Sequence, residues 1–175
     1  RIRLKPEQLT AILDFLKEQF PGIKRITSYC RSHTAARKTV DEFKQLRDSG
    51  LSRIHIGMES GSDDVLSLIH KGVTAADHIK AGLNIREAGI ELSEYVMPGL
   101  GGKQFTREHA LETAKVINAI NPDFVRLRTL HVVPGTGLDE LVKQGSFQPL
   151  GDEDILREIH LFIEHLEVRV TYLAS

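Results

Sequence analysis

Residues 54–62 read Ile-His-Ile-Gly-Met-Glu-Ser-Gly-Ser, and this stretch predicts a strand that turns sharply into a helix. Apolar and polar residues alternate up to Glu59, as in a strand that packs on one face, and Ser62 has the side chain of a helix N-cap. A carboxylate and hydroxyls at the carboxyl end of a strand, beside free helix amides, suit hydrogen bonding to ribose hydroxyls or an amino group. The same residues also fit a plain capped turn, in which Gly61 supplies only backbone freedom.

Similar units repeat along the chain, and together they predict an α/β protein with a parallel sheet. Apolar residues recur at helical spacing between the predicted strands, and Gly or Pro ends most of these regions. Thr74, with Asp77 three residues later, predicts one helix start, and Thr106 predicts another. The predicted strands cover residues 24–30, 54–58, 90–97 and 124–130, and the predicted helices cover 6–20, 36–49, 62–70, 74–88, 106–120 and two segments after residue 137.

The strand interiors carry charged residues where a sheet covered on both faces would be continuously apolar. In the last predicted strand, for example, Val125 and Leu127 flank Arg126. If the apolar residues of each strand pack on the helices, the residues that alternate with them form a common inner surface. We call this surface the polar face. Its candidate substrate or lumen residues are Tyr29, Arg31, His55, Tyr95, Arg126 and Arg128.

Glu94 is the one residue that breaks this alternation, because it lies on the parity expected to face the helices. An isolated buried charge is costly, so the polar face must be internally paired or must line a wet cavity that holds a polar ligand. The pattern therefore favours the wall of an open or partial barrel over a flat, doubly wound sheet. Structural ion pairs across the lumen are the alternative.

Length and composition narrow the class of protein further. The 175 residues are too few for a complete eight-stranded barrel of about 250 residues, and 41% hydrophobic with 27% charged residues is ordinary globular composition. Lys plus Arg is 23 and Asp plus Glu is 24, so the net charge of −1 disfavours nucleic-acid binding by bulk charge. No apolar run approaches the roughly 18 residues that span a bilayer, so we expect a cytoplasmic protein with no membrane partner.

The cysteine and histidine content predicts no metal site within the chain. Cys30 is the only cysteine, which excludes an internal disulfide and a cysteine-rich metal centre. The histidines show no His-x-x-x-His pair. Any cluster ligands must therefore come from outside this sequence, and a first residue other than Met suggests a piece of a longer protein.

Residues 98–102, Pro-Gly-Leu-Gly-Gly, form a glycine-rich loop between a predicted strand and a predicted helix. The G-x-G-x-x-G spacing of a dinucleotide-binding turn is absent. The glycines either let the backbone approach a flat ligand closely or form a flexible loop. The sequence contains no G-x-S-x-G elbow and no Walker loop, so acyl transfer by a serine and phosphoryl transfer have no support.

Taken in order, five segments resemble the radical S-adenosylmethionine (radical SAM) enzymes. The closest likeness is to the branch with Elongator-type, methylthiotransferase and oxygen-independent coproporphyrinogen oxidase-like barrels. The segments cover almost the whole chain and are residues 54–66, Lys71-Gly72-Val73-Thr74, Ala88-Gly89-Ile90, residues 96–102 and Val133-Pro134-Gly135-Thr136.

The resemblance implies a partial (βα)6 barrel of which this chain carries the C-terminal four strands, about the third to the sixth, in a single incomplete domain over residues 1–175. In that family a [4Fe-4S] cluster reduces S-adenosylmethionine and cleaves it to methionine and a 5′-deoxyadenosyl radical. By the same resemblance, the cofactor-binding residues would be Glu59, Ser60, Ser62, Met97, Gly99, Gly101, Leu127 and Thr129. Lys71 lies where relatives often have Arg.

One departure from the family pattern is large, because neither the Cys-x-x-x-Cys-x-x-Cys cluster loop nor the Gly-Gly-Glu-like contact is present. We expect both to precede this chain in a full-length parent, so the isolated chain should be inactive and its open sheet edge could self-associate. Two other functions stay open: a non-redox barrel enzyme such as an aldolase or epimerase, and a noncatalytic module that binds an adenosyl ligand. No motif identifies the substrate or the outcome of the reaction.

Overall fold

In a computed structural model, which describes residues 5–168 and 172–174, five strands pair in the order in which they occur along the chain. All four neighbouring pairs are parallel. The strands are β1 (Ile26–Cys30), β2 (Leu51–Glu59), β3 (Glu91–Val96), β4 (Phe124–Leu127) and β5 (Tyr172–Ala174). The predicted α/β class and partial barrel are confirmed, and β5 is a fifth strand that the sequence pattern did not predict.

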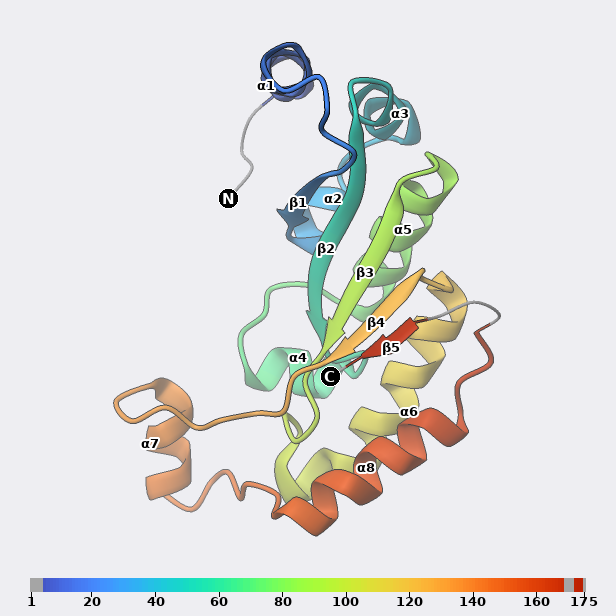
Figure 1. The fold of residues 1–175 in the computed structure, drawn as a ribbon. Helices are drawn as coiled ribbons and strands as arrows, with labels where there is room; N and C mark the ends of the chain where they lie inside the picture. Colours follow the sequence, from blue (N-terminus) through green and yellow to red (C-terminus); the bar gives the residue numbers. More distant parts are fainter. Residues whose placement is uncertain (1–4, 169–171, 175) are drawn as a thin grey trace.

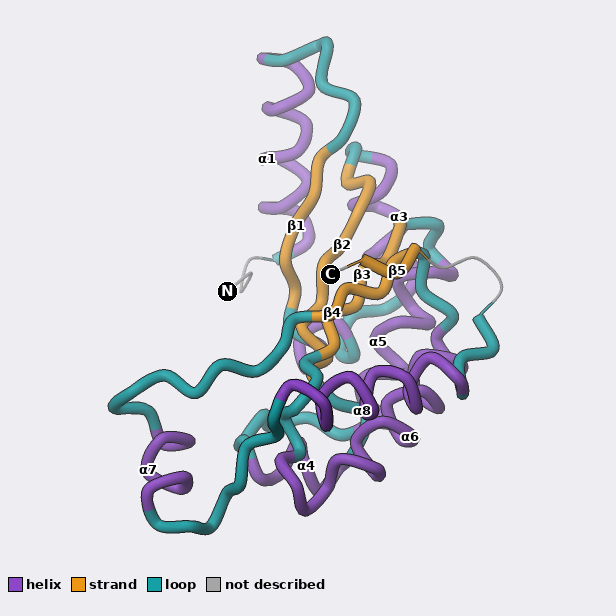
Figure 2. Tube along the Cα trace, turned by 60° about the horizontal axis from the view of Figure 1, so that its bottom comes forward, coloured by secondary structure: helices purple, strands orange, loops and turns teal. Residues whose placement is uncertain are grey.

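One helix precedes β1, and helices occur in every connection between the strands. They are α1 (Pro6–Gln19), α2 (Ser32–Ala35), α3 (Val40–Asp48), α4 (Asp63–Leu68), α5 (Ala75–Glu87), α6 (Gly102–Ile120), α7 (Gly137–Lys143) and α8 (Asp152–Glu164). In both views α3, α5 and α6 lie along one face of the sheet, and α8 runs beside α6 (Figures 1 and 2). No helix among residues 5–168 and 172–174 lies along the other face of the sheet.

The two faces of the strands have the polarity that the alternation predicts. Ile54, Ile56 and Met58 of β2 are buried against the helices, and the apolar residues of β3 and β4 join the same core. His55 and Glu59 lie on the opposite parity and are only partly buried. The hydrophobic core therefore occupies the space between the sheet and the helices, and the polar face is the side that carries no helical layer.

Local sequence explains most of the helix starts. The side chain of Thr74 accepts a hydrogen bond from the amide of Asp77 at the start of α5, and Ser62 caps α4 by accepting from the amide of Val65 at 3.3 Å. The predicted start at Thr106 is wrong, because α6 already begins at Gly102. There the first-turn amide of Lys103 donates to the carbonyl of Gln148 at 2.9 Å, so a side-chain cap is not needed.

Within the described part of the chain, none of the helices combines the length and the apolar character needed to cross a membrane.

Candidate functional site

The candidate site begins at Glu59, the last residue of β2, whose backbone has φ = 68°. A left-handed conformation is unfavourable for a residue with a Cβ, by roughly 1–2 kcal/mol. The strain turns the chain sharply out of the sheet, and the amide of Met97 donates to the Glu59 carbonyl at 2.9 Å. The carboxyl ends of β2 and β3 are thereby joined at the edge where parallel-barrel proteins place their ligands.

The Glu59 side chain folds back over the strand that carries it. Its Oε1 accepts from Lys71 Nζ at 3.2 Å, and about a fifth of each side chain is exposed. A Cβ on Gly57 would collide with this carboxylate, so a larger residue there would force the Glu59 side chain to move. The result is a paired carboxylate at the rim of the polar face, close enough to solvent to exchange Lys71 for a ligand.

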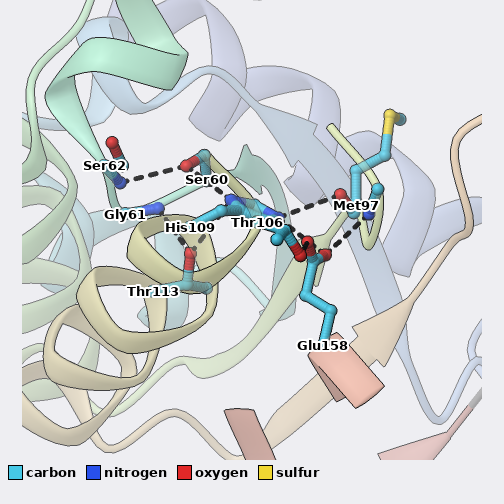
Figure 3. Close-up of polar contacts among 9 residues, drawn as sticks. Ser60, Gly61, Ser62, Met97, Thr106, His109, Thr113 and Glu158 are labelled. Atoms are coloured by element: carbon cyan, nitrogen blue, oxygen red, sulfur yellow. Dashed lines mark hydrogen bonds and ion pairs between the residues drawn. The ribbon is translucent and has the colours of Figure 1, made fainter. Parts of the chain in front are cut away.

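Behind this rim, a buried polar network joins the loop after β2 to the loop after β3 (Figure 3). We call it the loop clamp. Its members are Ser60, Gly61, Met97, Gly99, Thr106, His109, Thr113 and Glu158.

His109 of α6 is the centre of the loop clamp. Its Nε2 lies 3.1 Å from the Met97 carbonyl, which can only accept, so Nε2 carries the proton. Its Nδ1 then accepts from the Ser60 hydroxyl at 2.9 Å. Burial lowers the pKa of His109 to about 4, with the Met97 contact acting weakly in the opposite direction. The ring is therefore neutral near pH 7 and links one loop to the other.

Glu158 of α8 fixes the glycine-rich loop from the other side. Its Oε1 accepts from the Gly99 amide at 2.7 Å, and its Oε2 accepts from the Thr106 hydroxyl at 2.6 Å. Burial raises the pKa of Glu158, and these two hydrogen bonds partly oppose the rise. Its contact with His109 at 3.7 Å is not an ion pair near pH 7, because the imidazole is neutral.

The loop after β2, which carries Ser60 and Ser62, is held by further hydrogen bonds on the same side. The Ser60 hydroxyl accepts from the amide of Ser62 at 3.0 Å, and the Ser62 hydroxyl donates to Glu108 at 2.5 Å. Gly61 donates to the Thr113 hydroxyl at 2.9 Å, and a Cβ at Gly61 would meet the backbone of α6. Both serine side chains are thus buried and engaged by protein groups, and the adjoining Glu59 carries the partly exposed side chain of this turn.

Three rings form a small aromatic cluster on the polar face. Tyr29 stacks on His55 with ring centroids 4.9 Å apart, and Tyr95 lies 5.9 Å from His55 and 6.4 Å from Tyr29. Burial, followed by the charges of Arg126 and Arg53, lowers the pKa of His55. His55 is therefore neutral near pH 7, and its Nδ1 has no hydrogen-bond partner among the described residues.

Guanidinium groups surround this aromatic cluster. Arg128 lies over the Tyr95 ring at 5.9 Å, and the buried Nε of Arg126 has no hydrogen-bond partner within the described chain. Arg53, lower on β2, is satisfied by Glu91 at 2.8 Å and covers the Phe124 ring at 3.9 Å. Arg53 is thus held in an ion pair with Glu91, its neighbour on the adjacent strand, whereas Arg126 and Arg128 have no carboxylate partner among the residues described.

A cavity of about 1010 Å³ opens between the carboxyl end of β1 and the segment after α4. Polar and cationic side chains dominate its wall. They include Tyr29, Arg31, Arg37, Lys38, Glu42 and Lys71. Gly57 also lines it, so the cavity adjoins the Glu59 rim.

The remaining predicted cofactor residues surround the same edge of the sheet. The pairing of β3 with the chain after β4 continues past the strand end, because Arg128 donates to the Val96 carbonyl and Leu130 to the Pro98 carbonyl, each at 2.9 Å. Leu127 is buried and Thr129 is exposed. Gly101 packs tightly on Phe105. The structure thus brings all the predicted cofactor residues to one edge, and their contact with a ligand stays a prediction.

The sequence analysis missed His109 and Glu158. One signal was present on α6: Thr106, His109 and Thr113 occur on the stripe of an otherwise apolar helix face, next to the buried Ala110 and Ala114. Polar residues on a core-facing stripe indicate a buried hydrogen-bond network. Glu158 gave no such signal, because it is one of several acidic residues in α8.

The donor set does not fit a metal cluster. In the described ranges no three His, Cys, Asp or Glu side chains are grouped so that they could hold a metal ion, and Cys30 stands alone. The set does fit an adenosyl ligand, because the partly exposed Glu59 carboxylate contacts Lys71, which lines an open cavity, and the Glu59 carbonyl is bonded to Met97 at the start of the glycine-rich loop.

The fold and this edge define a partial (βα) barrel with its site at the carboxyl ends of the strands. Residues 3–117 match the Radical SAM superfamily, which is more than half of the chain. The chain therefore belongs to the Radical SAM superfamily, as the sequence resemblance indicated.

Comparison with known proteins agrees with this assignment. A tRNA uridine(34) acetyltransferase of Methanocaldococcus infernus is 29% identical over 119 residues, which are 67% of this chain and 22% of that protein. The solved structure of archaeal M. infernus Elp3 with an N-terminal deletion superimposes with a TM-score of 0.72 at 22% identity, over 97% of this chain and 44% of that one.

Coproporphyrinogen III oxidase of Escherichia coli, described as a radical SAM enzyme, has a TM-score of 0.69 at 20% identity, over 92% of this chain and 37% of that one. At these identities the solved structures show the fold alone. The chain spans less than half of the length of each of these three relatives.

Proposed function

We propose that the protein containing this chain is a radical SAM enzyme that cleaves S-adenosylmethionine reductively, and that this chain provides the part of the barrel that holds the adenosyl group. The observation that carries the proposal is the rim at the carboxyl ends of β2 and β3, where a strained Glu59 lies beside the glycine-rich loop in a chain of this superfamily. The substrate and the product stay open.

In this proposal each element of the rim has one task. The Glu59 carboxylate leaves Lys71 and accepts hydrogen bonds from ribose hydroxyls or from the ammonium group of the methionyl part. The backbone of residues 97–101, fixed by Glu158 and His109, flanks the adenine. Leu127 and Thr129 lie on the same side of the adenine. The bound cofactor supplies the C5′–S bond whose one-electron cleavage begins the chemistry.

The cluster has no place in this part of the mechanism. The described residues offer no donor set for it, so we propose that its ligands lie outside this chain and assign no step to it here. The tasks assigned to this chain are to bind the adenosyl group, to orient it and to hold the two loops in register.

The test uses the full-length protein, reconstituted anaerobically with iron and sulfide and reduced with dithionite. We expect 5′-deoxyadenosine and methionine in equal amounts by chromatography. A loaded cluster with no cleavage, in the presence and absence of cell extract as a source of substrate, would overturn the proposal.

Affinity for S-adenosylmethionine tests Glu59 itself. Losing one charge-assisted hydrogen bond costs about 1.5–3 kcal/mol, so Glu59→Gln should weaken binding roughly tenfold to a hundredfold without a comparable loss of stability. Glu94→Gln, on the helix-facing side, should change stability more than affinity. Glu87→Gln, at the exposed end of α5, is the matched control. Unchanged affinity in the Glu59 variant would remove this residue from the site.

A further inference from the structure

The polar face and its cavity carry a local excess of positive charge in a chain whose net charge is −1. Seven cationic side chains contribute, and they are Arg31, Arg37, Lys38, Arg53, Lys71, Arg126 and Arg128. Three carboxylates oppose them, and they are Glu42, Glu59 and Glu91. Seven minus three leaves four positive charges on this surface.

Each of these three carboxylates is already matched with a cation. Glu42 lies 3.7 Å from Lys38, and Glu59 lies 3.2 Å from Lys71. Glu91 lies 2.8 Å from Arg53. Four guanidinium groups are therefore left without a carboxylate partner among the residues that the structure describes, and they are Arg31, Arg37, Arg126 and Arg128.

S-adenosylmethionine does not offset this excess. Its sulfonium and ammonium groups outnumber its one carboxylate, so the cofactor has a positive net charge of its own. A surface lined with one sign of charge and adjoining a cavity concentrates ligands of the opposite sign. Guanidinium groups are especially suited to carboxylates and phosphates, which they bind through two parallel hydrogen bonds.

The same surface also offers a place for a flat ring. Tyr29 is stacked on His55 and has 68% of its surface exposed, so one of its sides is open to a further ring. The Nδ1 of His55 and the Nε of Arg126 are buried without hydrogen-bond partners in the described residues, so each keeps a hydrogen-bonding capacity that a bound ligand would satisfy.

We propose that the substrate is a small planar anion, an aromatic or heteroaromatic ring that bears a phosphate or carboxylate group. The ring packs on the cluster of Tyr29, His55 and Tyr95, and the anionic group binds the guanidinium groups of Arg126 and Arg128. This inference rests on the proposed function, since it assigns the substrate class of the same site.

The experiment is calorimetry on the full-length protein, reconstituted with its cluster and saturated with S-adenosylhomocysteine so that the adenosyl site is filled. The probes are uridine 5′-monophosphate, which has a ring and a phosphate, uridine, which lacks the phosphate, and ribose 5-phosphate, which lacks the ring. Orotate tests a ring with a carboxylate. We expect uridine 5′-monophosphate or orotate to bind at least about tenfold more tightly than uridine and ribose 5-phosphate.

Variants locate the binding. Arg126→Gln and, separately, the exposed Arg128→Gln should each weaken the planar anion about tenfold, and Tyr95→Leu should weaken it about fivefold. Arg107→Gln, an exposed arginine on α6, is the control and should have no effect. Thermal melts identify any variant that has lost its fold, and Arg128→Gln keeps the test valid if Arg126→Gln unfolds.

The possible outcomes of these experiments distinguish the inference from its alternatives. Equal binding of the charged and uncharged probes, or equal weakening by Arg107→Gln, overturns the inference. Tighter binding of a short single-stranded RNA that depends on the same arginines also overturns it, in favour of a polymeric ligand. Cofactor cleavage without planar-anion binding overturns only this inference, and planar-anion binding without cleavage overturns only the proposed function.

Discussion

The loop clamp lies on the helix side of the molecule and the polar face on the other side of the sheet, and the two regions differ in how their polar groups are partnered. In the loop clamp, His109 and Glu158 are almost fully buried, and each ring nitrogen and carboxylate oxygen has a protein partner. On the polar face, Arg126 and Arg128 have no acidic partner among the described residues, and Tyr29 is largely exposed.

This difference separates groups that hold the fold from groups that are available to a ligand. A buried polar group that loses its partner costs about 1–3 kcal/mol, so the loop clamp resists change. An accessible group that lacks a protein partner, such as the exposed Arg128 guanidinium, costs little, because water can hydrogen-bond to it. Substitutions in the two regions should therefore have very different effects on stability, and the predictions below test this from the largest effect to the smallest.

The largest effect of a single substitution is expected for His109→Leu. The substitution removes both hydrogen bonds of the ring and leaves the Ser60 hydroxyl and the Met97 carbonyl without this partner in a dry site. We expect a loss of about 4 kcal/mol in the free energy of unfolding, measured by urea denaturation. His160→Leu, on an exposed position of α8, should change it by less than about 0.5 kcal/mol. Equal effects would mean that the loop clamp does not stabilise the loops.

Acid should have the next effect, because it lowers the free energy of unfolding by protonating two buried histidines. Burial lowers the pKa of His78 and of His109 to about 4, below the ordinary 6.5. Between these values the unfolded state binds more protons than the folded state, so stability is present above pH 6.5 and is lost as the pH falls toward 4. Each histidine accounts for roughly 3 kcal/mol of this loss.

Urea titrations at intervals from pH 7 to pH 4 measure it. His109→Gln, which cannot ionise, should make the decline shallower by about half, because His78 still contributes. A decline of the same size in His109→Gln would exclude His109 as a source.

Glu94 should produce a smaller change in the free energy of unfolding, with a pH dependence opposite to that of the histidines. It is fully buried, both of its carboxyl oxygens are without hydrogen-bond partners in the described chain, and burial followed by the charge of Glu59 raises its pKa well above the ordinary value. The folded state then binds the extra proton, so stability is present at low pH and is lost as the pH rises above about 4.5.

Glu94→Gln keeps the shape and stays neutral, so at pH 8 it should be more stable than the parent by roughly 1–2 kcal/mol, with no difference at pH 4. The comparison of melts at the two pH values decides it. A variant that is less stable at pH 8 would show that the carboxylate is charged and satisfied.

The sequence predicted the side of the molecule that obeys a local pattern. The alternation around His55, Tyr95 and Arg126 identified the polar face, and Ser62 and Thr74 were recognised as caps because a cap acts within three residues of itself. The turn at Glu59 was also found, since strand and helix signals meet there.

The loop clamp could not be found in this way, because it depends on distant pairs. Ser60 and His109 are 49 residues apart, and Gly99 and Glu158 are 59 residues apart. The packing of α6 on the loop after β2 joins the first pair, the packing of α8 on α6 joins the second, and no local spacing encodes either contact. The same packing explains the wrong helix start, since the Thr106 hydroxyl is used by Glu158 and not by the backbone. β5 escaped prediction because three residues are too short for an alternating pattern.

The smallest effect on stability is expected on the polar face, and it completes the comparison. Arg128→Gln removes an exposed guanidinium group whose only described contact is with the Tyr95 ring at 5.9 Å, a distance at which the attraction to an exposed ring is weak. The free energy of unfolding should change by less than about 0.5 kcal/mol, with a small gain at low salt because one unpaired positive charge leaves a cationic surface. Urea denaturation at low and at moderate salt measures this gain, because the gain from reduced repulsion should shrink as salt screens the charges. If Arg128→Gln cost as much stability as His109→Leu, the polar face would be a structural layer like the loop clamp. The inference that its unpaired arginines bind a ligand would then be contradicted.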